Sequence, residues 1–331
     1  MTFLRTDSLP RLLGAIVVVA AFGSGCARRG PGPSVSPPIV TPPTIPTAIA
    51  GINTKWDDFN AAKPANSLGL VYSTNRGSEG HDLDVFAADV AWGPKPSATG
   101  EPVRFSPALM SSADERGPIL LPAAQWTGGR PWEEVLLFAS GREGGKGGLD
   151  LYWAGPCPGN QHDCPGAPQN LAELNSAAND AYLTLPFRGR RVLFASDRDG
   201  GYDIHEASWK DGAKYTDAPA SVRKVAALST DADDTAPYVA EFGDRIEVVF
   251  VSKRDGGSGG YDIWCSRLEG ESWAAPVNLA AGINSPGDEF RPSVFRVENA
   301  SFLVFSSNRP GGEGGFDLYT VSYPGCAPHG R

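Results

Sequence analysis

The sequence has 331 residues, 41% of them hydrophobic, with 40 glycines, 29 prolines and a formal net charge of −9. Removal of a predicted leader, which carries Arg5, Asp7 and Arg11, leaves 27 basic and 37 acidic residues, a net charge of −10. Such an acidic chain lacks the basic surface that holds a phosphate backbone, which excludes nucleic acid as an expected partner. The many glycines and prolines favour short strands joined by turns, in one large all-β domain.

Residues 1–25 have the features of an export signal. Two arginines precede an apolar core at 12–22, which is too short to span a bilayer. The three small residues before Cys26 resemble the lipobox of bacterial lipoproteins, although Gly23 stands where leucine is usual. This resemblance implies that Cys26 is acylated and becomes the mature N-terminus, so that its lipid holds the chain at a membrane. The alternative is an ordinary secreted protein whose Cys26 pairs or is removed.

Residues 26–50 contain seven prolines and no hydrophobic period, which predicts an extended, semi-rigid spacer. The folded domain is expected to span 51–323, followed by a tail at 324–331. Ala27 follows the cysteine in place of the aspartate that marks inner-membrane lipoproteins in some bacteria. The lipoprotein resemblance therefore implies attachment to the outer membrane of a cell envelope, on the periplasmic face or the cell surface.

The stretch from Phe302 to Ser322 carries a pattern that recurs four more times upstream. An apolar run ends at an arginine, a glycine-rich loop follows, and an aspartate opens a second apolar run, which predicts a β-hairpin. The arginines lie 66, 56, 56 and 55 residues apart. A repeat of this length in a β-rich chain predicts a five-bladed β-propeller of four-stranded antiparallel blades. The five arginine and aspartate pairs are Arg76 and Asp84, Arg142 and Asp150, Arg198 and Asp203, Arg254 and Asp262, and Arg309 and Asp317.

The arginine and the aspartate are eight residues apart in four repeats and five apart in the third, so the loop length changes while the pair is retained. This predicts that the two side chains meet in space. We call the acidic residue before each first strand a rim acid, and expect it at the same edge of the blade. One reading is structural, because a guanidinium near a dry interface needs carboxylates; the other is a cation site or a landing surface for a basic partner. The rim acids are Asp58, Glu115, Asp180, Asp234 and Glu289.

Three further patterns resemble chemical sites without their required context. Gly256–Gly260 matches the G-x-S-x-G pattern of hydrolases, but a hairpin loop replaces the strand, elbow and helix, so Ser258 is not expected to be a nucleophile. The aspartates of the loop at 197–203 mimic a calcium loop but are not repeated together in other blades, and turn chemistry explains them. The four histidines show no metal spacing. No catalytic residue, metal or cofactor is predicted.

Five cysteines fit an exported protein with one lipidated residue and two disulfides. Cys157 and Cys164 bracket a short insert and are expected to pair, with a metal clip that uses His162 as the alternative. Cys265 and Cys326 form the second pair by default, which would tie the C-terminal tail to the fourth blade.

The repeats resemble the WD40-like propeller repeats of TolB-type proteins. The motifs F-x-S-x-R, GG-x-GG and D-I-Y recur, and Trp273–Tyr319 matches nearly throughout, including a W-xx-P-x-NL segment and an acidic pair before the next blade. The resemblance covers about 51–323 and implies the fold. TolB itself has six blades and an additional N-terminal domain, which this sequence does not show, so an envelope role is only an analogy.

The sequence favours a non-catalytic binding or scaffolding platform, lipid-anchored in the envelope with an envelope protein as partner, and not an enzyme. The alternative is a five-bladed propeller enzyme that acts on glycans through channel carboxylates. A carboxylate pair about 5–10 Å apart at the channel mouth would favour the enzyme. Rim acids that all pair with the repeat arginines would favour the platform. Ring closure is expected to use a strand near Ile52–Phe59 beside the last blade.

Overall fold

A computed structural model describes residues 40–65, 67–158, 164, 166–185, 190–279 and 282–326. The predicted export signal, Cys26 and His162 lie outside the described residues. Within those ranges the one α-helix is α1 (Ala123–Trp126), with 3-10 turns at Arg76–Ser78 and Pro107–Leu109. None of these helices is long and apolar enough to cross a membrane.

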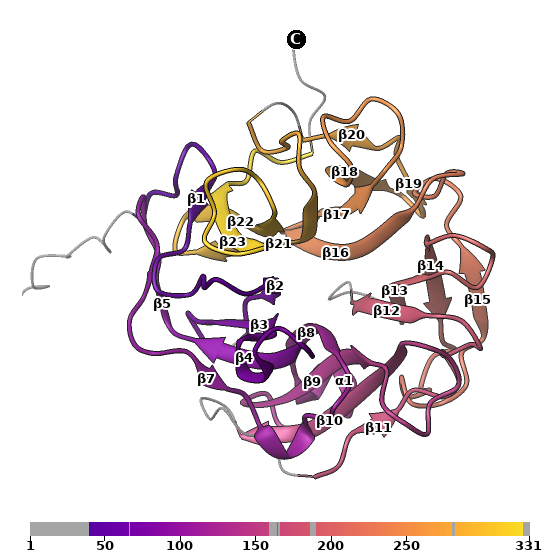
Figure 1. The fold of residues 1–331 in the computed structure, drawn as a ribbon. Coiled ribbons are helices and arrows are strands. Elements are labelled where there is room, and N and C mark those ends of the chain that lie inside the picture. Colours follow the sequence, from indigo (N-terminus) through magenta and orange to yellow (C-terminus); the bar gives the residue numbers. More distant parts are fainter. Residues whose placement is uncertain are drawn as a thin grey trace, which may run out of the picture. The chain divides into compact units, whose positions relative to one another are not determined.

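Five four-stranded antiparallel sheets form the blades of a five-bladed propeller, as predicted (Figure 1). The first strand of each blade lies nearest the centre of the ring in Figure 1 and begins at a rim acid. These first strands are β2 (Asp58–Ala62), β8 (Glu115–Pro122), β12 (Asp180–Thr184), β16 (Asp234–Phe242) and β21 (Glu289–Val297).

The second and third strands of each blade form the predicted hairpins. They are buried on both faces because a blade packs between two neighbours, which explains their continuous apolar runs. The second strands are β3 (Leu70–Thr74), β9 (Glu133–Ser140), β13 (Arg191–Ser196), β17 (Arg245–Ser252) and β22 (Ala300–Ser307). The third strands are β4 (Asp84–Ala88), β10 (Asp150–Pro158), β14 (Asp203–Ser208), β18 (Asp262–Glu269) and β23 (Asp317–Ser322).

The fourth strands are short and lie at the outside of the ring. In chain order of the blades they are β7 (Val103–Arg104), β11 (Gln169–Asn170), β15 (Ser221–Lys224), β20 (Val277–Asn278) and β1 (Thr47–Ala48). Two small additions complete the described strands: β5 (Val90–Ala91) pairs with β6 (Ser97–Ala98), and β19 (Ser272–Trp273) pairs with β18.

The ring closes through β1, which pairs with β23 of the last blade and gives that blade its fourth strand. The prediction that the closing strand lies near Ile52–Phe59 is therefore wrong. The closing strand must lie outside β23, whereas Asp58–Ala62 is needed as the innermost strand of the first blade. A second link comes from the first strand itself, since the Asp58 N–H donates to the Phe316 carbonyl over 2.8 Å.

The glycine-rich loops dock against the start of the next blade. A Cβ atom on Gly147 would lie 1.9 Å from the Ala178 carbonyl oxygen, and one on Gly314 would lie 2.1 Å from that of Trp56. Neither distance is possible for a real side chain, so the loop needs glycine for close approach between two backbones. The repeated GG-x-GG motif is therefore a contact between blades.

Both predicted disulfides are confirmed. Cys157 and Cys164 are bonded across the insert that leaves β10, and Cys265 in β18 is bonded to Cys326. A metal clip at the first pair is wrong, because the two sulfur atoms are bonded to each other. The second bond fastens the C-terminal end of the described chain to the fourth blade, as expected.

Candidate functional site

Each repeat arginine forms an ion pair with the rim acid of its own blade. The Nη2 to carboxylate distances run from 2.5 to 3.0 Å, and all five rim acids have side chains of zero exposure. The same Nη2 atoms also donate to backbone carbonyls, such as that of Leu109 from Arg142 over 2.8 Å. The carboxylates accept further bonds from a Ser or Thr four residues earlier, as Glu289 does from Ser285. This buried network uses the rim acids fully.

The aspartates that open the third strands do not fill the predicted place beside the arginines. Asp262 accepts N–H bonds from Ser258 and Gly259 of its own glycine-rich loop, and Asp317 does the same for Glu313 and Gly314. The loop amides need an acceptor inside the turn, which a short acidic side chain supplies. Asp150 binds its own loop in the same way, through the N–H groups of Lys146 and Gly147. The other two bind elsewhere: Asp84 pairs with Arg104, and Asp203 lies 2.7 Å from Lys224.

A second ring of polar side chains lies directly before the rim acids, and sequence reasoning did not single it out. Each member accepts a hydrogen bond from the N–H of the residue before the third strand of the preceding blade, over 2.8 to 3.2 Å. We call this set the clasp ring, because each bond joins two blades. Its members are Asp57, Asp114, Asn179, Asp233 and Asp288.

A signal for the clasp ring is present in the sequence. In every blade the rim acid is the second residue of a doublet, such as Asp57-Asp58 or Asp288-Glu289. The second residue is buried against an arginine, whereas the first is partly exposed, with side-chain exposures of 27% for Asp114 and 31% for Asp233. The position that solvent and ligands can reach is therefore the first residue of the doublet.

Aromatic side chains gather inside the clasp ring, near the axis of the propeller. Phe59 stacks on Phe290 with ring centres 5.1 Å apart, and Phe316 packs edge-on against Phe59 at 4.7 Å. Tyr261 and Tyr182 also meet Phe290, at 5.2 and 5.7 Å. We call these five residues the aromatic mouth. All of them except Tyr182 are partly exposed.

Tyr261 connects the aromatic mouth to two carboxylates. Its N–H donates to Asp288 over 2.8 Å, and its hydroxyl donates to Asp233 over 3.1 Å. Lys253 also donates to Asp233, over 3.0 Å. Burial would raise the pKa of Asp233, but bonds from Lys253, the Tyr202 N–H and the Tyr261 hydroxyl lower that pKa overall. Asp233 is therefore held in its ionised form.

The other clasp carboxylates have different neighbours. Asp114 forms an ion pair with Arg116. Asp57 and Asp288 accept amide N–H groups: Asn75 Nδ2 lies 3.2 Å from Asp57, and Asn308 Nδ2 lies 3.2 Å from Asp288. The clasp ring thus offers carboxylates in three electrostatic settings around one aromatic centre.

The calcium-like aspartates have structural contacts. Asp197 accepts the N–H of Asn179 over 2.6 Å, and Asp199 lies 3.1 Å from Nε2 of His205. Among the residues that the structure describes, no group of three or more His, Cys, Asp or Glu side chains is arranged to hold a metal ion.

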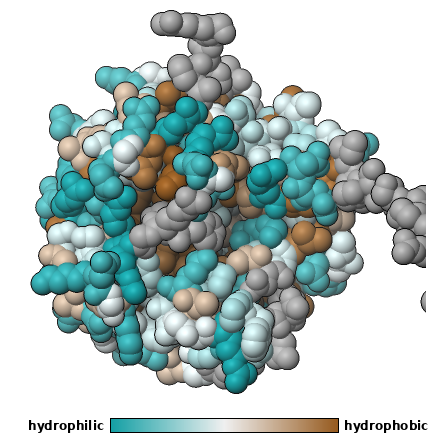
Figure 2. All heavy atoms as spheres, turned by 180° about the vertical axis from the view of Figure 1, so that it is seen from behind, coloured by the Kyte–Doolittle hydropathy of each residue, from teal (hydrophilic) through white to brown (hydrophobic). Residues whose placement is uncertain are grey.

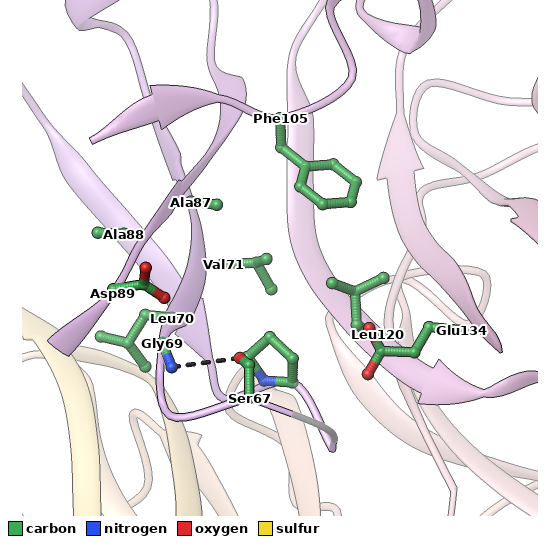
Figure 3. A pocket seen from close by; sticks show the side chains of 11 residues that line it. Ser67, Gly69, Leu70, Val71, Ala87, Ala88, Asp89, Phe105, Leu120 and Glu134 are labelled. Atoms are coloured by element: carbon green, nitrogen blue, oxygen red, sulfur yellow. Dashed lines mark hydrogen bonds between the residues drawn. The ribbon is translucent and has the colours of Figure 1, made fainter. Parts of the chain in front are cut away.

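A separate cavity of about 280 Å³ lies between the first and second blades (Figure 3). Phe105, Val71 and Leu120 form apolar wall, and Asp89 and Glu134 lie on opposite sides of the opening in Figure 3. None of the lining residues belongs to the clasp ring or the aromatic mouth. This cavity is thus a different place from the site at the axis.

Exposed apolar side chains are scattered over the described surface. In Figure 2, the face behind that of Figure 1 is mostly hydrophilic, with hydrophobic residues in separate patches. The large exposed apolar residues come from different parts of the ring, and single residues of this kind are normal on globular proteins. They are Ile45, Leu68, Val103 and Trp132.

No family model and no curated protein matches this chain. Several solved structures do, with 10 to 12% identity. An endo-arabinase from Bacteroides thetaiotaomicron (12% identity) covers 86% of this chain and 99% of its own, with a TM-score of 0.54. A thermostable family-43 glycoside hydrolase has 11% identity and a TM-score of 0.57, and the match covers 87% of this chain and 98% of the hydrolase. The catalytic domain of a GH62 alpha-L-arabinofuranosidase from Coprinopsis cinerea has 10% identity and a TM-score of 0.55, and the match covers 87% of this chain and 100% of that domain. At such identity the likeness shows a shared fold.

These neighbours correct the expected function. We predicted a non-catalytic scaffolding platform and no enzyme activity, and both predictions are contradicted by the three structures named above, which are an endo-arabinase, a family-43 glycoside hydrolase and an arabinofuranosidase. Every rim acid does pair with a repeat arginine, but this pairing does not show that the protein is a platform. It only removes the rim acids from the set of available carboxylates, and the clasp ring supplies others.

Proposed function

We propose that this protein is a propeller enzyme that hydrolyses glycosidic bonds at the aromatic mouth. The observation that carries the proposal is the placement of Tyr261 between two clasp carboxylates, Asp233 and Asp288, beside the partly exposed rings of Phe59 and Phe290. Aromatic faces with a few well-placed polar groups are typical of small-molecule sites, and a sugar ring fits such a surface. The architecture shared with glycoside hydrolases adds support.

Hydrolysis of a glycosidic bond needs two carboxyl groups, one that protonates the leaving oxygen and one that acts as base or nucleophile. The rim acids are unsuitable, because they are fully buried and paired with arginine. Asp233 suits the second role, since its lowered pKa keeps it ionised. Asp288 is the other carboxylate bound to Tyr261, and we assign it the proton-donor role.

The names of these structural neighbours suggest which class of substrate to test first. They are named as an endo-arabinase and an arabinofuranosidase, so arabinose-containing polysaccharides are the first class to test. In this arrangement the sugar at the point of cleavage lies on Phe290 and Phe59, with the scissile bond toward Tyr261.

The test is hydrolysis of a glycan panel by the wild type and three Asp→Asn variants. Asn179 makes the clasp bond in the third blade, so asparagine preserves the clasp. Asp233→Asn and Asp288→Asn should lower kcat by about 10²–10⁴-fold, the usual effect of losing an acid or base. Asp57→Asn changes the same type of clasp bond in the first blade and should retain activity. Failure of the wild type on the whole panel, or equal loss in all three variants, would contradict the proposal.

We also propose that the enzyme is held at the bacterial outer membrane by lipid on Cys26, in line with the lipobox resemblance. Incorporation of a labelled fatty acid, lost in Cys26→Ala, is the expected result. Labelling that persists in this variant would contradict the assignment.

A further inference from the structure

A ring of five residues surrounds the propeller axis at the third position of each first strand. All five have positive φ angles, and the strand pairing shifts register beside each of them, so every first strand carries a bulge at the same level. We call this set the axial ring. Its members are Asn60, Gly117, Tyr182, Ala236 and Arg291.

Arg291 crosses the axis and is completely buried. Its Nη1 donates to the Pro237 carbonyl over 2.7 Å, and its Cζ lies 5.4 Å from the centre of the Tyr182 ring. Gly117 makes room for the Tyr182 ring, since a Cβ there would lie 2.6 Å from Cδ1 of Tyr182. Nε and Nη2 of Arg291 have no hydrogen-bond partner among the described residues.

The setting of Arg291 differs from that of the repeat arginines. Each repeat arginine pairs with a buried carboxylate, whereas the ion pairs of the described chain include none to Arg291. Burial lowers the pKa of Arg291 to about 10, which still leaves it charged at neutral pH. A buried charge without a counter-ion is strongly unfavourable, so the site calls for an anion.

Other polar atoms near this level of the first strands also lack partners. Both amide atoms of Asn60, the hydroxyl of Thr235 and the hydroxyl of Ser293 are buried and unpartnered in the described structure. Two to three residues further along the first strands lies a cavity of about 50 Å³, lined by Tyr238, Thr184 and Lys63 among others, none of them acidic. None of the axial-ring residues lines this cavity, so the unpartnered atoms of Arg291, and not the cavity, define the proposed site.

We propose that the axial ring binds one small inorganic anion, chloride in ordinary buffers, against Nε and Nη2 of Arg291. The anion neutralises the guanidinium and occupies the donors that the protein leaves unpaired. The site shares Tyr182 with the aromatic mouth, but the proposal does not depend on the glycosidase proposal. Its effect is on the stability of the ring, because the anion joins the fifth blade to the residues that face it across the axis.

Crystals of the full chain grown with bromide in place of chloride provide the first test. An anomalous peak within hydrogen-bonding distance of Arg291 is expected. A map with no such peak, consistent with water alone, would overturn the proposal. This result does not depend on any variant folding.

Thermal unfolding provides the second test. At constant ionic strength, replacement of gluconate by chloride should raise the Tm of the wild type, because a ligand that binds only the folded state stabilises it. Arg291→Met should lose this chloride-specific rise, and Arg291→Lys should keep part of it. Arg309→Met, which removes a carboxylate-paired arginine, is the matched control and should keep the full rise. An equal rise in Arg291→Met would contradict the site.

Discussion

At the scale of single residues, each doublet divides two tasks between neighbouring side chains. The second residue, such as Glu289, is buried with an arginine, and removal of one partner of a buried pair costs about 3–5 kcal/mol. The first residue joins two blades through one hydrogen bond, which Asn179 makes as well as Asp288 does. A carboxylate at the clasp position is therefore not needed for the fold, so its charge is available for chemistry.

The carboxyl of Asp84 gives a prediction about pH. Burial raises its pKa to about 6, with Arg104 opposing the rise and Asp82 and Glu115 adding to it. Because the folded-state pKa exceeds the unfolded value, the stabilising effect of the bound proton is complete below about pH 4 and is lost as the pH rises through about 6. Asp84→Asn stays neutral, so its Tm relative to wild type should be higher at about pH 7.5 than at about pH 4.5. A difference that is constant across this range would contradict the assignment.

At the scale of elements, the hairpins could be predicted from sequence but the bulges and the closing strand could not. Apolar runs and glycine-rich loops mark β22 and β23 unambiguously. The five bulge residues, in contrast, all have positive φ angles but differ in residue type: they are asparagine, glycine, tyrosine, alanine and arginine. No sequence pattern therefore marks the bulges. The closing strand Thr47–Ala48 has only two residues and follows a proline-rich stretch, so it shows no alternation to detect.

A substitution that adds one methyl group tests how the last glycine-rich loop packs against the first blade. Gly314→Ala would place a Cβ 2.1 Å from the Trp56 carbonyl oxygen, so the fifth blade must move away from the first. We expect a loss of about 1–3 kcal/mol in the free energy of unfolding, measured with denaturant. Gly93→Ala is the control, because a Cβ on that residue would have nothing described within 4 Å of it. Equal stability of the two variants would show that the loop contact is unimportant.

At the scale of the whole ring, the repeat predicted five blades, while the candidate site depended on contacts between repeats. The sequence showed the doublets but not that Tyr261 of one blade lies between Asp233 and Asp288 of two doublets. Such contacts depend on how neighbouring blades are placed, which a pattern within one repeat does not specify. The rim acids were more prominent in the pattern, yet burial withdraws them from solvent.

Ring closure predicts a sharp boundary for truncation. A chain that begins at Gly51 lacks β1 and the buried Ile49, whose N–H donates to the Leu318 carbonyl over 3.0 Å. It should melt at a clearly lower temperature than a chain that begins at Val40, which keeps both. Equal melting temperatures, measured by circular dichroism, would mean that β1 does not hold the ring closed.

The same closure sets the order of events during synthesis. Asn53 accepts a hydrogen bond from the Leu318 N–H across 265 residues of chain, and β1 is made long before its partner strand β23. Contacts that distant in sequence form slowly, and β1 stays unpaired until β23 has been made. The ring of the nascent polypeptide therefore remains open while the blades between these two strands are being made.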